Sequence, residues 1–227
     1  MRNGSASCSA DPLIITIDGP AGVGKSTVAK LLARRLGLKY VDTGATYRTL
    51  AYHAIRKGLD PRDEAAMLRL ARSLRAVIRQ SARIRTERVT DAAAAVAQHP
   101  KVRGELVRLQ RRLARRSPCV VEGRDTGSVV FPNARHKFFL TANVRVRARR
   151  RQQELRQVQG HAPEVGLIAK QLRQRDGLDL RRRIGPLVKP AGAVVLDTSE
   201  LSVGEVVRRL LRRVKGPDAC CPCAGRP

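Results

Sequence analysis

Residues 13–27 are Leu-Ile-Ile-Thr-Ile-Asp-Gly-Pro-Ala-Gly-Val-Gly-Lys-Ser-Thr. Their first part, 13–17, is a β-branched apolar run that is typical of a buried strand. Residues 19–26 match the phosphate-loop pattern G-x-x-x-x-G-K-[ST] at every fixed position. The segment 26–36 is rich in Ala and Leu with amphipathic spacing, which predicts a helix. Because strand, loop and helix follow in the order that the motif requires, we expect the chain to bind a nucleoside triphosphate.

The residue types in this loop suit a polyphosphate. Glycine permits backbone conformations that other residues avoid, and the N–H groups at a helix N-terminus attract anions. Lys25 would place its charge at the β- and γ-phosphates, and the Ser26 hydroxyl would ligate Mg²⁺. The residues that we expect to bind the nucleoside triphosphate are Gly19, Pro20, Ala21, Gly22, Val23, Gly24, Lys25, Ser26 and Thr27.

Length and composition favour a single α/β domain with a modest insertion. The chain has 227 residues, of which 42% are hydrophobic but only 3% aromatic, so its core must be aliphatic. No apolar run approaches the length of a membrane-spanning helix. Residues 1–12 lack the apolar stretch of a secretory signal, and we expect a cytoplasmic location.

The formal net charge is +27, from 46 Lys and Arg residues against 19 Asp and Glu residues. Such an excess has two interpretations, a nucleic-acid-binding surface or a general background of arginine. The basic residues are spread over many predicted helices and lack neighbouring aromatic side chains on which bases stack. We therefore expect weak, non-specific attraction to polyanions and no specific nucleic-acid partner.

The cysteines do not form a convincing metal site. Cys220, Cys221 and Cys223 lie close together near the C-terminus, but they lack a fourth ligand and a nearby histidine. We therefore expect residues 215–227 to be a disordered tail and residues 1–12 a disordered N-terminus. Cys119 begins an apolar run and is predicted to be buried.

Short apolar runs alternate with helical patterns along the chain. Strands are predicted at 13–17, 39–42, 119–122, 136–141 and 193–197. Helices are predicted at 26–36, after an N-cap at Thr43, and at 64–79, 87–98, 102–116, 145–159, 165–175 and 202–214, with a polar irregular stretch at 176–183. This alternation predicts an α/β fold, a five-stranded parallel sheet flanked by helices.

The loops that follow the strands should gather at one edge of this sheet and form the site. These loops lie at 19–26, 42–48, 123–127 and 197–199, and each is rich in glycine or charge. A second substrate that carries phosphate would need arginine there, because a planar guanidinium binds phosphate through two hydrogen bonds. The candidates are Arg48, Arg103, Arg124, Arg175 and Arg182.

Three strings in these loops together resemble bacterial cytidylate kinase, a P-loop nucleoside monophosphate kinase. They are residues 17–26, Asp-Thr-Gly-Ala-Thr-Tyr-Arg at 42–48, and Glu-Gly-Arg-Asp-Thr-Gly-Ser-Val-Val-Phe-Pro at 122–132. The resemblance implies a monomeric enzyme that uses ATP and Mg²⁺ to phosphorylate CMP or dCMP in pyrimidine nucleotide metabolism. It also implies one kinase domain at 13–214, with an acceptor-binding subdomain at about 60–116 and a lid at about 145–183.

The same resemblance implies roles for individual residues. The implied acceptor-binding residues are Thr43, Tyr47 and Arg48 on one helix, Arg103 and Asp125 at the cytosine, Arg124 and Arg182 at the phosphate, and Arg175 and Asp179 at the sugar. The implied lid arginines are Arg147, Arg150 and Arg151. Catalysis would rest on Lys25, Arg124, Arg147, Arg151 and Arg182, which stabilise the charge of the moving phosphoryl group or hold the acceptor.

The chain departs from the family pattern in two places. The span 77–85 is too short, by roughly a dozen residues, for the small strand insertion that the family carries there. Ala94 stands where the family often has a serine that hydrogen-bonds the acceptor, and the loss of one such bond costs about 0.5–1.5 kcal/mol. The preference among CMP, dCMP and UMP is therefore left open.

Other functions compatible with a phosphate loop are a small-molecule kinase of the shikimate or gluconate type, a basic RNA-binding protein, and a paralogue that binds ATP without turnover. Small-molecule kinases of that type share the phosphate loop but lack the sequence strings found here at 42–48 and 122–132. The net charge motivates the second, and the shortened insertion motivates the third.

Overall fold

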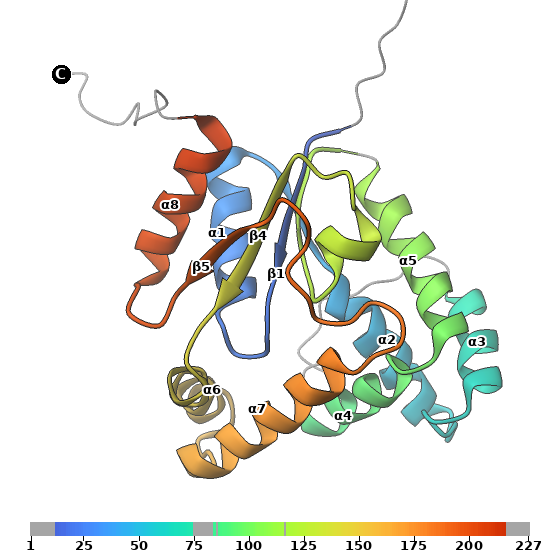
Figure 1. Ribbon diagram of the computed structural model, residues 1–227. Coiled ribbons are helices and arrows are strands. Elements are labelled where there is room, and N and C mark those ends of the chain that lie inside the picture. Colours follow the sequence, from blue (N-terminus) through green and yellow to red (C-terminus); the bar gives the residue numbers. More distant parts are fainter. Residues whose placement is uncertain (1–11, 75–83, 85, 116, 217–227) are drawn as a thin grey trace, which may run out of the picture.

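The computed structural model describes residues 12–74, 84, 86–115 and 117–216 (Figure 1). Within these ranges the strands are β1 (Ile14–Asp18), β2 (Lys39–Asp42), β3 (Cys119–Glu122), β4 (His136–Thr141) and β5 (Val194–Asp197). They form one sheet in the order β2-β3-β1-β4-β5, and every neighbouring pair is parallel. The predicted five-stranded parallel sheet is confirmed.

The described helices surround this sheet. They are α1 (Lys25–Leu36), α2 (Thr43–Arg56), α3 (Glu64–Ser73), α4 (Glu87–Val96), α5 (Pro100–Ala114), α6 (Val144–Gln159), α7 (Val165–Leu180) and α8 (Val203–Lys215). A π-helical turn, η2 (Thr126–Val130), follows β3 closely. In Figure 1 the helices α2, α4, α6 and α7 lie below the sheet, at the carboxyl ends of its strands.

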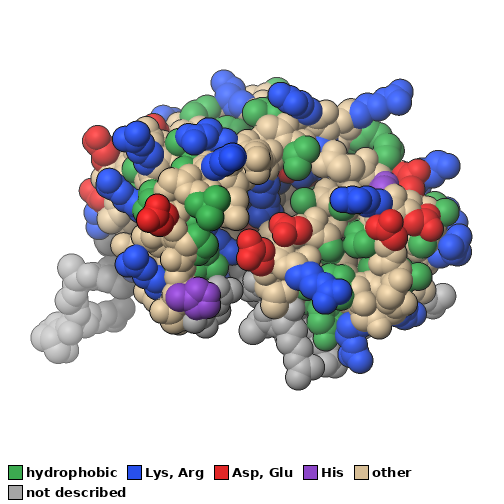
Figure 2. All heavy atoms as spheres, turned by 90° about the horizontal axis from the view of Figure 1, so that it is seen from below, with side chains coloured by type: hydrophobic (Ala, Val, Ile, Leu, Met, Phe, Trp, Pro, Cys, Tyr) green, Lys and Arg blue, Asp and Glu red, His purple; other side chains and the backbone are tan. Residues whose placement is uncertain are grey.

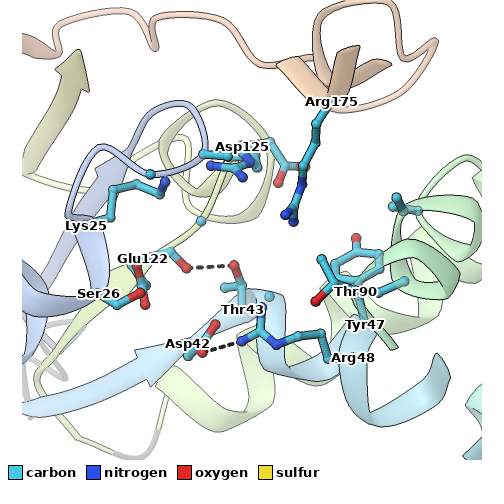
Figure 3. A pocket seen from close by; sticks show the side chains of 18 of the residues that line it. Lys25, Ser26, Asp42, Thr43, Tyr47, Arg48, Thr90, Glu122, Asp125 and Arg175 are labelled. Atoms are coloured by element: carbon cyan, nitrogen blue, oxygen red, sulfur yellow. Dashed lines mark hydrogen bonds and ion pairs between the residues drawn. The ribbon is translucent and has the colours of Figure 1, made fainter. Parts of the chain in front are cut away.

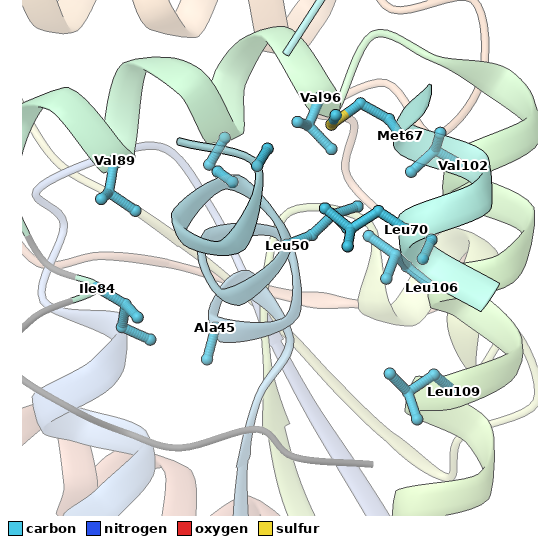
Figure 4. Packing of buried hydrophobic residues seen from close by; sticks show 14 of the residues in the cluster. Ala45, Leu50, Met67, Leu70, Ile84, Val89, Val96, Val102, Leu106 and Leu109 are labelled. Atoms are coloured by element: carbon cyan, nitrogen blue, oxygen red, sulfur yellow. The ribbon is translucent and has the colours of Figure 1, made fainter. Parts of the chain in front are cut away.

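The aliphatic core is divided between two main clusters. In the first, α1 and α8 pack with β1 and β4 through residues such as Ile17, Leu32 and Phe138, none of which is more than 1% exposed. The second joins α2, α3, α4 and α5, with Leu50 and Met67 fully buried (Figure 4). The helices that carry the second cluster therefore have an apolar core of their own beside the sheet.

A smaller cluster connects α6 and α7 with the phosphate loop. Ala148, Ile168 and Leu172 from the two helices pack around Ala21. The position of the helix pair is thus tied directly to the loop that follows β1. No helix in the described ranges is both long and apolar enough to cross a membrane.

The structure corrects several element boundaries. Asp42, and not Thr43, caps α2, because its Oδ1 accepts a hydrogen bond from Ala45 N at 2.9 Å. Helix α7 continues to Leu180 instead of ending near 175, so most of the stretch 176–183 is helical. Helix α4 ends at Val96 and α5 starts at Pro100, where the missing N–H of proline costs no helical bond. Residues 75–79, predicted to continue α3, lie outside the described residues, as do Cys220, Cys221 and Cys223.

Candidate active site

A pocket of about 250 Å³ lies beyond the carboxyl ends of β1, β2 and β3. Its lining comes from the phosphate loop, the starts of α1 and α2, α4, α5, the turn after β3, and the pair α6 and α7. Figure 2 looks from below onto a hollow that has Lys and Arg side chains in its depth. The predicted site residues that line the pocket are Ala21, Gly22, Lys25, Ser26, Thr43, Tyr47, Arg48, Arg103, Arg124, Asp125, Arg151, Arg175 and Arg182.

The phosphate loop has the backbone shape that its glycines predict. A Cβ at Gly19 would overlap the carbonyl oxygen of Leu140 in β4, and Gly24 caps α1 at φ +91°. Lys25 begins the helix, is only 9% exposed, and donates from Nζ to the carbonyl oxygen of Pro20 at 2.7 Å. Burial, with a smaller effect from the Arg124 charge, lowers the pKa of Lys25 to about 7. The loop thus places a buried lysine side chain at the N-terminus of α1, where a bound phosphate would favour its charged form.

An acidic side chain faces this loop from the end of β3. Glu122 is 3% exposed and accepts a hydrogen bond from the Tyr40 hydroxyl, and its backbone oxygen accepts one from Thr43 Oγ1 at 2.7 Å. Burial and the Glu122 charge raise the pKa of Tyr40. Figure 3 shows Glu122 beside Ser26 and Lys25. Hard oxygen donors from a carboxylate and a hydroxyl suit Mg²⁺, which takes its remaining ligands from water and substrate phosphate.

Arg124 connects the phosphate loop with α7. Its NH1 donates to the carbonyl oxygen of Gly19 at 2.6 Å, and its Nε lies 2.8 Å from Asp179 Oδ2. Asp179 also pairs with Arg182 and is only 2% exposed, so it lies behind both arginines instead of lining the pocket. Burial and the Arg124 charge lower the pKa of Arg175 to about 10. The guanidinium groups of Arg124, Arg175 and Arg182 therefore converge on one side of the pocket.

A buried ion pair closes the end of the pocket next to α5. Arg103, 2% exposed, pairs with Asp125, which is 6% exposed. The Arg103 guanidinium carbon lies 5.6 Å from the centre of the Tyr47 ring, within cation–π range. Burial raises the pKa of Asp125 and raises that of Tyr47 to about 12. This end of the pocket therefore presents hydrogen-bond donors of Arg103 and acceptors of Asp125 at fixed positions shielded from solvent. Such an arrangement can recognise a planar polar base.

Residues 15–216 match the family model of cytidylate kinase. The chain belongs to the cytidylate kinase family. It is 44% identical to the cytidylate kinase of Halalkalibacterium halodurans over 215 residues, covering 88% of this chain and 96% of that protein. The cytidylate kinase of Mycobacterium leprae is 42% identical over 214 residues, covering 89% of this chain and 96% of its own. A solved structure of an uncharacterized protein from Eubacterium ventriosum covers 89% of this chain and 98% of its own at 12% identity, with a TM-score of 0.52, and supports the fold alone.

The alignments also bear on the length of this cytidylate kinase family member. The match of 215 residues to the Halalkalibacterium halodurans protein covers 88% of 227 residues, which is about 200. The relative therefore carries about 15 residues that this chain lacks within the aligned length. The loss of roughly a dozen residues within 77–85 stays a prediction.

Some residues that the family resemblance implied do not face the pocket. Arg147 donates from NH1 to the carbonyl oxygen of Ala21 at 3.1 Å and pairs with Asp176 at 2.5 Å. Asp176 in turn accepts from the Ala21 backbone N–H at 3.3 Å. Arg150 donates to Thr198 Oγ1 at 3.1 Å. Arg147 and Arg150 thus hold α6 to its surroundings, whereas Arg151 lines the pocket.

Sequence reasoning missed several polar residues of the site. Asp42 pairs with Arg48 at 2.6 Å, and Glu122 and Thr90 line the pocket. Asp18, fully buried, accepts hydrogen bonds from the backbone N–H groups of Thr126 and Gly127 at 2.8 and 2.7 Å. Asp42 and Glu122 each end a predicted strand, and Asp18 directly follows one, so this position was a usable signal. Thr90 lies one helical turn before Ala94, which places both on one helix face.

Proposed function

We propose that the protein transfers the γ-phosphoryl group of ATP to CMP or dCMP, giving ADP and CDP or dCDP. The observation that carries this proposal is one pocket with the phosphate loop on one side and the Arg103–Asp125 pair on the other. A kinase needs its donor phosphates and its acceptor in line within one enclosed site. Membership of the cytidylate kinase family supports a cytosine nucleotide as the acceptor.

The described side chains divide the work of phosphoryl transfer between them. Lys25 and Arg151 would stabilise negative charge on the transferred group, because that charge spreads over its outer oxygens in the transition state. Arg124 and Arg182 would hold the acceptor phosphate, which is itself the nucleophile and needs no general base. Their shared contact with Asp179 fixes both guanidinium groups in advance.

Ser26, and Glu122 directly or through water, would hold Mg²⁺ at the triphosphate. Bound there, the ion would neutralise charge on the donor phosphates. The hydrogen bond from the Tyr40 hydroxyl would keep the Glu122 carboxylate oriented toward this position.

We propose that α6 and α7 act as a lid and that the helices with their own core, α2 to α5, form the acceptor-binding subdomain. Water must be excluded from the site during transfer, because water competes with the acceptor for the phosphoryl group. Arg147 would serve the reaction by tying α6 to the phosphate loop at Ala21, and it would reach the donor phosphates only after leaving Asp176. The reaction is proposed to take place in the cytoplasm.

The direct test is a coupled assay of ADP release with Mg²⁺ and ATP, offering CMP, dCMP, UMP and AMP separately. We expect turnover with CMP and dCMP to exceed that with UMP by tenfold or more, since about 1.4 kcal/mol of discrimination gives that ratio. Equal rates with UMP would indicate that selectivity for cytosine over uracil depends on the segment that the insertion of this chain lacks. No turnover with any monophosphate, in folded protein that binds ATP, would refute the proposed function.

A further inference from the structure

Helix α4 and its C-cap residue contribute one stripe of surface to the pocket, which we term the α4 wall: Thr90, Ala93 and Ala94 from the helix, and Ala97 as the C-cap. Their spacing places all four on one face of the helix. Three of the four side chains are single methyl groups, so most of this wall is flat and apolar. A surface of that kind accepts the face of a planar heteroaromatic ring.

Thr90 is the polar member of the α4 wall. The side chain is half-buried, and its hydroxyl makes no hydrogen bond to any residue in the described ranges, although its backbone N–H donates to Thr86 O at 3.0 Å. Figure 3 shows Thr90 next to Tyr47 and across the pocket from Lys25. The hydroxyl is therefore placed on the acceptor side of the pocket with its hydrogen-bonding capacity available.

The other end of the α4 wall meets the buried ion pair. Arg103 NH1 donates to the carbonyl oxygen of Ala97 at 3.4 Å, and Arg103 is paired with Asp125. Thr90 and Ala97 are separated by about 10 Å along the helix axis, from a rise of 1.5 Å per residue. Hydrogen bonds of about 3 Å at each end leave room for one ring between them. A pyrimidine base fits that span, with its face on Ala93 and Ala94.

We propose that the Thr90 hydroxyl hydrogen-bonds one edge of the acceptor's pyrimidine base, opposite the edge that faces Arg103 and Asp125. This inference rests on the proposed function, which makes the acceptor a pyrimidine monophosphate. A hydroxyl both donates and accepts, so it pairs with a ring carbonyl or with an exocyclic amino group. Thr90 thereby supplies, from one turn earlier in α4, a hydrogen bond that the methyl group of Ala94 cannot make.

The test is Thr90→Val, which keeps the branched shape and removes only the hydroxyl. We expect KM and the calorimetric Kd for CMP to rise about three- to tenfold, the effect of one lost hydrogen bond. KM for ATP and Tm should stay close to those of the unaltered protein. Thr90→Ser keeps the hydroxyl and should bind CMP nearly as well as the unaltered protein does.

A rescue variant separates a contact from a packing effect. In Thr90→Val combined with Ala94→Ser, the new hydroxyl lies on the same helix face, and most of the CMP affinity should return. A Kd for CMP in Thr90→Val that equals that of the unaltered protein would overturn the inference, while CMP turnover by the unaltered protein would leave the proposed function standing. Parallel losses in CMP affinity, ATP affinity and Tm would also overturn it, because they would indicate a structural role.

Discussion

Lys25 carries a charge that the reaction needs in a place that disfavours charge. Burial lowers its pKa to about 7 from an ordinary 10.5, whereas a bound triphosphate favours the charged form. At about pH 8 the free protein should therefore take up a proton when ATP binds. Calorimetry in buffers of different ionisation enthalpy measures this uptake. Lys25→Met should abolish transfer and remove the proton uptake, and an unchanged uptake in that variant would assign the proton to another group.

The same shift determines how stability depends on pH. Because the folded pKa of Lys25 lies below the unfolded one, the unfolded chain holds the extra proton between about pH 7 and 10.5. The contribution of Lys25 to the free energy of unfolding is therefore least favourable below about pH 7 and improves as the pH rises toward 10.5. Lys25→Met should accordingly raise Tm more at about pH 6 than at about pH 9.

Which individual residues form the site could be predicted only in part from the sequence. The strings around Lys25, Arg48 and Arg124 located the loops, and residues from all three loops line the pocket. The strings do not indicate which way a side chain points. Asp179 was expected at the substrate but lies behind two arginines, and Asp18 was overlooked although it is fully buried.

At the scale of elements, strands were easier to predict than helix ends. Apolar runs bounded by polar turns define β3 and β4, and the predicted spans equal the observed ones. Helix α7 is five residues longer than predicted, because its last turn buries a charged residue, Asp179, against arginines from other segments. In the sequence alone, the charged stretch 176–183 resembles a polar loop, because nothing there shows that Asp179 pairs with Arg124 and Arg182. The π-helical turn η2 likewise depends on a distant partner, Asp18.

Asp18 joins two elements, β1 and η2, through one carboxylate. Its oxygens accept from Thr126 N and Oγ1, both at 2.8 Å, and from Gly127 N at 2.7 Å. Asp18→Asn would turn an NH₂ group toward one of these buried donors, which should lower the free energy of unfolding by about 2–3 kcal/mol. Because η2 directly follows Arg124 and Asp125, KM for CMP should rise more than KM for ATP. Urea unfolding and steady-state kinetics measure the two effects.

A matched control for the Asp18 contact with η2 is Thr126→Val. It removes one of the three donors, Thr126 Oγ1, and leaves the hydrogen bonds from the backbone N–H groups of Thr126 and Gly127. Its loss of stability should be about 1 kcal/mol, and its KM for CMP should change less than in Asp18→Asn. An equal rise in both KM values in Asp18→Asn would show that β1, and not η2, had moved.

At the scale of the whole molecule, the division of the core suits a kinase. One cluster fixes the sheet with α1 and α8, another holds α2 to α5 together, and the pocket lies between these parts and the α6–α7 pair. Separate apolar clusters allow parts to move relative to one another without opening a core. The basic residues follow no such division, and in Figure 2 they are spread over the visible face instead of gathered in one patch.

The net charge of +27 makes stability depend on ionic strength. Repulsion among like charges on the surface destabilises the folded state and is screened by salt, whose Debye length falls from about 30 Å at 0.01 M to about 8 Å at 0.15 M. Raising KCl across this range should therefore raise Tm by about 2–4 °C, which corresponds to about 1 kcal/mol in a chain of this size. Scanning calorimetry measures the change, with chloride as the anion because sulfate and phosphate bind directly at a phosphate loop.

A fall in Tm over the same range would mean that attractive ion pairs outweigh the repulsion. The pairs Arg103–Asp125 and Arg124–Asp179 are nearly buried, whereas Arg72–Glu105 and Arg108–Glu105 are exposed surface pairs, which contribute little attraction. Buried pairs are screened much less than surface charges, so salt should weaken the repulsion more than the attraction. The same screening should raise KM for ATP, since the polyanion is drawn to the pocket by the same excess of positive charge. Stability and substrate affinity should thus respond to salt in opposite directions.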